Sequence, residues 1–261
     1  MKLPSSWIVG GGAVALWLRE RAGRQSAERL AAATLEALLN AIDANDAMTG
    51  AHVRRTAAYA LILARAAELD EASRRSVERV ALFHDIGKIH EALFDIVHDD
   101  AKLTPEEREA VATHPQRGAD VLAPLAGFYP ELAEGVLSHH ERWDGTGYPR
   151  KLRGDAIPIA ARVVAIADTF DALTHSRRYH HGESSRRGAD VIAEERGTQF
   201  DPELVDLFLS PTVMECVEQQ MHANDPKPTV ERPHEQERRT QERESDVPDV
   251  RFRWRSPQST P

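Results

Sequence analysis

Apolar residues in this chain recur at intervals of three and four positions over long stretches. Ala31, Leu35, Leu38 and Ile42 form one such series, and this period places them on a single face of a helix. The strict alternation of apolar and polar residues that marks half-buried strands is scarce. The sequence therefore predicts an all-α fold.

Local signals place the individual helices. One helix is expected to carry His52 and to end near Ala64, and the next to run from about residue 71 through 84 and 85 to Gly87, a residue that favours helix C-termini. Thr104, followed by Pro105 and by a glutamate three residues on, predicts another helix start. Further helices are expected over residues 115–125, 131–140, 159–173, 187–195 and 202–220.

The chain is expected to form three regions. Residues 25–221 carry the helical patterns and should form the folded domain. Residues 222–261 are rich in Pro, Glu, Arg, Gln and Ser and predict a disordered, charged tail. Residues 1–24 form an apolar leader. Because no sizeable sensory domain precedes Gln25, we expect control to come from a partner, from the membrane or from the level of expression.

The apolar run at residues 7–18 has two interpretations. Arg19, Arg21 and Arg24 follow it, as basic residues do on the cytoplasmic side of a membrane anchor. A spanning helix needs about 20 apolar residues, however, and no small-residue cleavage site follows the run. The alternatives are a hydrophobic leader on a cytoplasmic protein and an anchor that tethers it to the inner face of the membrane.

Composition narrows the classes of partner. The formal net charge is −9 and the sequence pI about 5.8, which disfavours a binding surface for polymeric nucleic acid. A small anionic substrate is still possible, because the positive charge of a metal cluster can locally outweigh the negative net charge of the protein. The single cysteine, Cys216, excludes an internal disulfide and cysteine-based zinc sites. Any metal site must therefore use nitrogen and oxygen ligands.

The pair His84-Asp85 is the strongest indication of a metal site in the sequence. An imidazole and a carboxylate offer ligands to a metal ion, and the two oxygens of Asp85 can bridge two ions. Lys88 follows closely and is suited to neutralise a phosphate oxygen. Taken singly, each histidine is as well explained by a structural role, and Asp171 either supports a ligand or caps its own helix. Further metal-type residues lie at His52, His114, His139, His140 and Asp168.

Taken in order, these motifs resemble the HD-GYP domain, the cyclic di-GMP phosphodiesterase branch of the HD metallohydrolase superfamily. The resemblance covers about Leu38 to Val217 and implies an HD-type helical bundle with a buried binuclear metal site. The matching segments are HDIGK at 84–88, LTPEE at 103–107, His114-Pro115 with Gly118-Ala119, HHERWDGTGYP at 139–149, Ile157-Pro158, ADTFDALT at 167–174 and GTQFDP at 197–202.

The resemblance also implies roles by position. Asp85 matches the bridging carboxylate and, with Lys88, forms the expected catalytic pair. Family members with a third metal carry Glu four residues before the first histidine, where this chain has Met48, so we expect two divalent metal ions, iron or manganese, with zinc as an alternative. The implied metal ligands are His52, His84, Asp85, His114, His139, His140 and Asp168. The implied substrate-binding residues are Lys88, Tyr148, Asp171 and Arg177.

The implied reaction is hydrolysis of cyclic di-GMP to the linear dinucleotide, with slow or no further cleavage to GMP. Val53, Arg178 and His180 depart from the usual family residues and leave the nucleotide preference open. One alternative is a phosphohydrolase for another cyclic dinucleotide or nucleotide. The other is a signalling module that binds nucleotide or protein without turnover. The expected partners are a cyclic dinucleotide, GGDEF-type signalling proteins and, through residues 7–18, a membrane.

Overall fold

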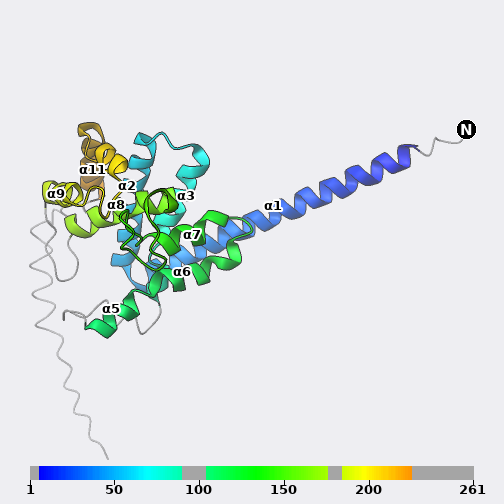
Figure 1. The fold of residues 1–261 in the computed structure, drawn as a ribbon. Coiled ribbons are helices and arrows are strands. Elements are labelled where there is room, and N and C mark those ends of the chain that lie inside the picture. Colours follow the sequence, from blue (N-terminus) through cyan, green and yellow to red (C-terminus); the bar gives the residue numbers. More distant parts are fainter. Residues whose placement is uncertain (1–5, 90–103, 176–183, 225–261) are drawn as a thin grey trace, which may run out of the picture. The chain divides into compact units, whose positions relative to one another are not determined.

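The computed structural model describes residues 6–89, 104–175 and 184–224 of the chain (Figure 1). The chain divides into two units, Met1–Asn224 and Asp225–Pro261, and all described residues belong to the first. The expected tail at 222–261 therefore lies almost wholly outside the described residues. Arg177 and the neighbouring positions 178 and 180 lie outside them as well.

The described residues are helical, as the sequence predicts. Their only strand-like pairing is an isolated bridge between Arg196 and Phe200. The α-helices are α1 (Ser6–Asn45), α2 (Ala47–Ala66), α3 (Glu71–Phe83), α5 (Pro105–Val111), α6 (His114–Leu122), α7 (Pro130–Ser138), α8 (Ile159–Thr174), α9 (Ser185–Glu194), α10 (Pro202–Phe208) and α11 (Pro211–Asn224). Three 3₁₀ turns join them: η1 (Ile86–Ile89), η2 (Ala123–Leu125) and η3 (Gly154–Ala156).

Side-chain caps and prolines set the helix boundaries. Asp46 accepts hydrogen bonds from the first turn of α2, and Asp70 accepts one from Ser73 N at 2.7 Å at the start of α3. The prediction of one helix over 202–220 was wrong. The segment divides into α10 and α11 at Pro211, because proline lacks the N–H that a helix interior needs.

The end of α3 also differs from the prediction. The helix stops at Phe83, and the chain turns at His84 and Asp85 before η1. Gly87 lies in that 3₁₀ turn, where a Cβ atom would approach the carbonyl oxygen of His114 to 2.1 Å. Glycine at this position therefore lets η1 pack directly against the start of α6.

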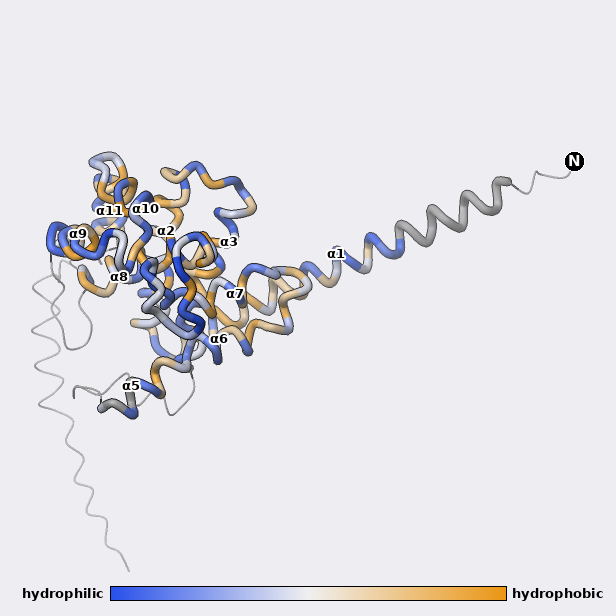
Figure 2. Tube along the Cα trace, viewed as in Figure 1, coloured by the Kyte–Doolittle hydropathy of each residue, from blue (hydrophilic) through white to orange (hydrophobic). Residues whose placement is uncertain are grey.

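The core lies around α2, which contacts α1, α3, α8, α10 and α11. Tyr59 of α2 meets Phe170 of α8 edge to face at 5.6 Å between ring centroids, and Phe170 meets Phe208 of α10 at 5.3 Å. All three rings are fully buried. Along the described helices, hydrophobic residues recur between short hydrophilic stretches, as amphipathic patterns predict (Figure 2).

The N-terminal helix α1 runs without a break through the expected boundary at residues 24 and 25. Its C-terminal half contributes Ala31, Leu35 and Ile42 to the core, which are three members of the predicted apolar stripe. No helix in the described part of the chain is both long and apolar enough to cross a membrane.

Candidate metal centre

The fold brings the seven metal-type residues predicted from the sequence to one place. Each comes from a helix or from the residues directly after one, so the scaffold that holds them is rigid. His52 lies on α2, His84 and Asp85 follow α3, His114 begins α6, His139 and His140 follow α7, and Asp168 lies on α8. Four of the helix segments involved, α2, α3, α7 and α8, pack against one another in pairs, as seen in Figure 1.

The ligand atoms form two groups with Asp85 between them. One group consists of His52, His84 and Asp85, and the other of His114, His139 and His140. Asp85 Oδ1 lies 3.4 Å from His114 Nε2, while Asp85 Oδ2 lies 3.6 Å from His84 Nε2. The carboxylate thus turns one oxygen toward each group, as a bridging ligand does.

Asp168 completes the first group. Its Oδ1 lies 3.1 Å from His52 Nε2 and 3.6 Å from His84 Nε2. Separations of about 3 to 3.5 Å are those between neighbouring ligand atoms around an ion bound at about 2.0–2.2 Å.

Backbone carbonyl groups orient three of the imidazoles. The Nδ1 atoms of His84, His114 and His139 lie 2.8, 2.7 and 2.6 Å from the carbonyl oxygens of the residues three positions earlier. A carbonyl oxygen only accepts hydrogen bonds, so each Nδ1 carries the hydrogen. When such a ring is neutral, its lone pair lies on Nε2, which faces the centre. Such support of the distal nitrogen is usual for metal-ligating histidines.

The resulting arrangement fits cations. Burial and Lys88 lower the pKa of His114 to about 3, and burial and the neighbouring imidazoles lower the pKa of His139 well below its usual value. Both rings are therefore neutral at pH 7, yet their Nε2 atoms, each with a lone pair, stand only 3.1 Å apart. Two lone pairs at that distance repel unless a cation binds both. Within the described residues, His84 Nε2 and Asp85 Oδ1 are also buried without a hydrogen-bond partner. The donor set suits divalent metal ions.

Asp85 is ionised in this setting. Burial alone would raise its pKa, but the charge of Lys88 and the nearby imidazoles outweigh burial and hold the pKa well below its usual range. Lys88 Nζ donates to Asp85 Oδ2 at 2.7 Å, from η1 at the edge of the centre. Its side chain is 26% exposed, so the ammonium group reaches both the carboxylate and solvent.

Asp171 lies behind His52, on the side away from the centre. Its Oδ2 accepts from His52 Nδ1 at 2.6 Å, and its two oxygens accept from Arg55 at 2.7 and 2.9 Å. His175 Nδ1 lies 3.1 Å from the same carboxylate. Asp171 is 1% exposed and is engaged by three side chains, an arrangement that suits a residue that orients His52. The substrate contact expected for this position stays a prediction.

Tyr148 lies at the mouth of the centre. Its ring stacks on His140 at 5.0 Å between centroids, and burial raises its pKa to about 12. The loop that carries it is tight, since a Cβ on Gly147 would approach the amide nitrogen of Arg142 to 2.3 Å. A cavity of about 240 Å³ opens here, lined by His139, His140, Glu141, Arg142, Thr146, Gly147, Tyr148, Ala165, Asp168, Thr169 and Gln199.

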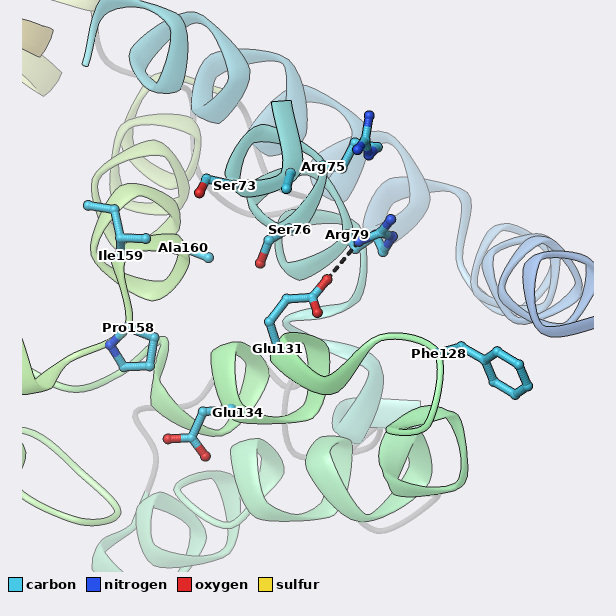
Figure 3. Close-up of a pocket in the computed structure, with 11 residues that line it drawn as sticks. Ser73, Arg75, Ser76, Arg79, Phe128, Glu131, Glu134, Pro158, Ile159 and Ala160 are labelled. Atoms are coloured by element: carbon cyan, nitrogen blue, oxygen red, sulfur yellow. Dashed lines mark hydrogen bonds and ion pairs between the residues drawn. The ribbon is translucent and has the colours of Figure 1, made fainter. Parts of the chain in front are cut away.

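A second cavity, of about 460 Å³, opens between α3, α7 and the start of α8 (Figure 3). Figure 3 shows Glu131 of α7 reaching to Arg79 of α3, and their ion pair measures 2.7 Å. Arg75, also on its wall, pairs with Glu71 at 2.9 Å. None of the seven metal-type residues lines this cavity, so it is separate from the metal centre.

Sequence reasoning missed two supporting groups. Arg55 holds Asp171, and its position one helical turn after His52 was a usable signal, because residues three apart share a helix face. Arg142 donates to Glu195 and Gln199, which lie more than 50 residues further along the chain, and no local sequence pattern predicts that contact.

Met48, where family members with a third metal carry Glu, is 41% exposed, and its thioether is not a ligand for a hard metal ion.

A helical bundle in which a carboxylate stands between two groups of histidines is an arrangement suited to holding two divalent metal ions. The chain belongs to the HD domain family, whose profile matches residues 36–204. The resemblance inferred from the motifs is confirmed.

Curated proteins and solved structures include several relatives. The chain is 37% identical over 174 residues to 3′3′-cGAMP-specific phosphodiesterase 2 of Vibrio cholerae, covering 66% of this chain and 33% of that protein. It is 36% identical over 199 residues to a cyclic di-GMP phosphodiesterase response regulator of Xanthomonas campestris, covering 76% and 52%. The chain thus spans about a third to a half of these relatives' length.

A solved structure shares the fold. A cyclic GMP-AMP-specific phosphodiesterase of V. cholerae superposes with a TM-score of 0.54 at 22% identity, covering 74% of this chain and 50% of that one.

Proposed function

We propose that this chain is a metal-dependent phosphodiesterase that hydrolyses cyclic di-GMP to the linear dinucleotide. The observation that carries the proposal is the pair of facing ligand groups with Asp85 between them. Relatives named as cyclic di-GMP phosphodiesterases support the choice of substrate. Because another relative is named as specific for 3′3′-cGAMP, that dinucleotide is the second candidate substrate.

Two divalent ions would be held by His52, His84, Asp85 and Asp168 on one side and by Asp85, His114, His139 and His140 on the other. When bound, such ions supply Lewis acidity toward water and phosphate. We infer iron or manganese, with zinc as an alternative, because the ligands are imidazoles and carboxylates. The exposed thioether of Met48 supports two ions rather than three.

In the proposed reaction one water attacks phosphorus and the bond from phosphorus to the 3′ oxygen breaks. The water's hydroxyl stays on phosphorus, and its other proton goes to the departing 3′ oxygen. Lys88, beside Asp85, is positioned to neutralise a non-bridging phosphate oxygen. Tyr148 keeps its proton at neutral pH and can donate a hydrogen bond at the mouth of the cavity. Arg55 and Asp171 keep His52 in the ligating orientation.

The test is hydrolysis of cyclic di-GMP by protein purified without oxygen and loaded with iron or manganese. We expect turnover by the parent and by Asp206→Ala, whose side chain is exposed in an ion pair with Arg196, but none by Asp85→Ala. Chromatography should show the linear dinucleotide as the main product. Tight nucleotide binding without hydrolysis by the metal-loaded parent would instead support the role of a binding module. GGDEF-type partners and membrane association through residues 7–18 stay predictions.

A further inference from the structure

The Tyr148 loop is held to the segment before α10 through Arg142. Arg142 Nη1 donates to Gln199 Oε1 at 2.7 Å, and Arg142 Nη2 donates to Glu195 Oε2 at 2.9 Å. Thr198 Oγ1 donates to the same Glu195 oxygen at 2.7 Å. Arg142 Nε also donates to Thr146 Oγ1 at 3.1 Å, so two side chains besides Gln199 hold the guanidinium group.

The backbone of Gln199 is fixed as well. Its carbonyl oxygen accepts from the amide of Trp143 at 3.0 Å, and its own amide donates to the carbonyl of Glu195 at 3.1 Å. Side chain and main chain are thus both tied, so the carboxamide loses little further freedom on meeting a ligand.

The orientation of that carboxamide follows from chemistry. Arginine has hydrogen-bond donors only, so the Gln199 atom that faces it must be the carbonyl oxygen. The amide nitrogen of Gln199, with its two hydrogens, has no hydrogen-bond partner within the described residues. Gln199 lines the same cavity as Asp168, Tyr148 and Thr169. Next to the metal centre, the chain therefore presents an amide whose nitrogen can donate and whose oxygen is directed at Arg142, which uses one of its two lone pairs.

We propose that Gln199 is a specificity-determining residue that reads a hydrogen-bond acceptor on the purine base of the substrate and thereby favours guanine over adenine. Guanine offers two acceptors, O6 and N7, on one edge. The matching edge of adenine has one acceptor and one donor, and a glutamine pairs with both only when its oxygen and its nitrogen face the base together. Arg142 already directs the oxygen toward its own guanidinium group. For its substrate class this inference rests on the proposed function.

The variant Gln199→Glu tests the proposal. Glutamate has the same shape and retains the contact with Arg142, but it offers only acceptors. We expect KM for cyclic di-GMP to rise on the order of tenfold, with a smaller change for cyclic di-AMP and with kcat less affected than KM. The control is Gln25→Glu, since Gln25 is exposed on α1 outside the cavity and should leave both constants unchanged. An equal change for both dinucleotides, or none for cyclic di-GMP, would overturn the proposal.

Equilibrium dialysis of both dinucleotides against the metal-loaded parent and Gln199→Glu separates this inference from the proposed function. If the parent binds cyclic di-GMP without hydrolysing it, and Gln199→Glu weakens that binding selectively, the base-reading role stands and the phosphodiesterase assignment fails. If the parent hydrolyses cyclic di-GMP and cyclic di-AMP with equal kcat/KM, the base-reading role fails alone. Absence of binding to either dinucleotide would overturn both.

Discussion

Replacing Asp171 with asparagine tests whether the carboxylate behind His52 sets the metal affinity of the centre. In the parent, Asp171 accepts from His52 Nδ1 at 2.6 Å and from Arg55 through two bonds. Asparagine keeps the shape but removes the charge, and its NH₂ group cannot accept from the guanidinium. His52 then loses a charge-assisted hydrogen bond and the fixed ring orientation that bond provides.

The expected loss can be given a magnitude. Removing a group that orients a metal ligand typically weakens metal affinity by about 10- to 100-fold, which corresponds to about 1.4–2.7 kcal/mol. The loss should fall on the ion held by the His52 group, because the hydrogen bonds of His114 and His139 to backbone carbonyls are unchanged. After desalting, the metal content should therefore fall from two ions per chain toward one.

The assay is an anaerobic competition titration against a metal-binding indicator, with metal content measured by mass spectrometry. Asp206→Asn is the matched control: it removes the same charge from an exposed ion pair with Arg196, and it should change neither affinity nor content. Affinity of Asp171→Asn within threefold of the parent, with circular dichroism showing an intact helical fold, would refute the orienting role.

Three further outcomes are expected. Burial disfavours the charged ring of His52, but the hydrogen bonds and charges of its two carboxylate neighbours outweigh burial and raise its pKa from 6.5 to about 9. Protonated His52 therefore stabilises the metal-free protein fully below about pH 6.5, and this contribution is lost as the pH rises through about 9. In urea titrations at pH 6, 7.5 and 9, the free energy of unfolding should decline with pH in the parent, and His52→Gln should lack that decline. Gly87→Ala should cost about 2 kcal/mol or more, because its Cβ would collide with the backbone of His114, whereas Gly127→Ala, with open space around it, should leave thermal stability nearly unchanged. Phe170→Ala should lower the free energy of unfolding by about 3–5 kcal/mol in a denaturant titration, because the ring is fully buried, and a loss below 1 kcal/mol would contradict its place in the core.

The helix boundaries show where local sequence signals suffice and where they fail. The start of α5 at Pro105 was predicted to the residue and that of α3 as about residue 71, since capping side chains and prolines act within one turn. The end of α3 was predicted too late. His84 and Asp85 leave the helix because Gly87 packs against the backbone of His114, and that contact depends on a helix more than 20 residues away.

In the candidate site, too, some features follow from the local sequence and others depend on contacts between distant segments. The carbonyl groups that orient His84, His114 and His139 belong to residues three positions earlier, so the chain's local geometry already sets which nitrogen faces the centre. The partners in contacts between distant segments are not set by local geometry. Arg55 meets Asp171 across 116 positions, and Arg142 meets Gln199 across 57.

The sequence by itself determined the kinds of ligand, their order and their helical setting, because residue type and short-range periodicity follow directly from the chain. Only the tertiary structure decided that Asp85 turns one oxygen to each ligand group, that Asp171 faces His52, and that Arg142 occupies the carbonyl of Gln199. The first two features depend on how α2, α3, α7 and α8 pack. The burial of apolar faces drives that packing, and it involves many residues, so no single motif reveals it.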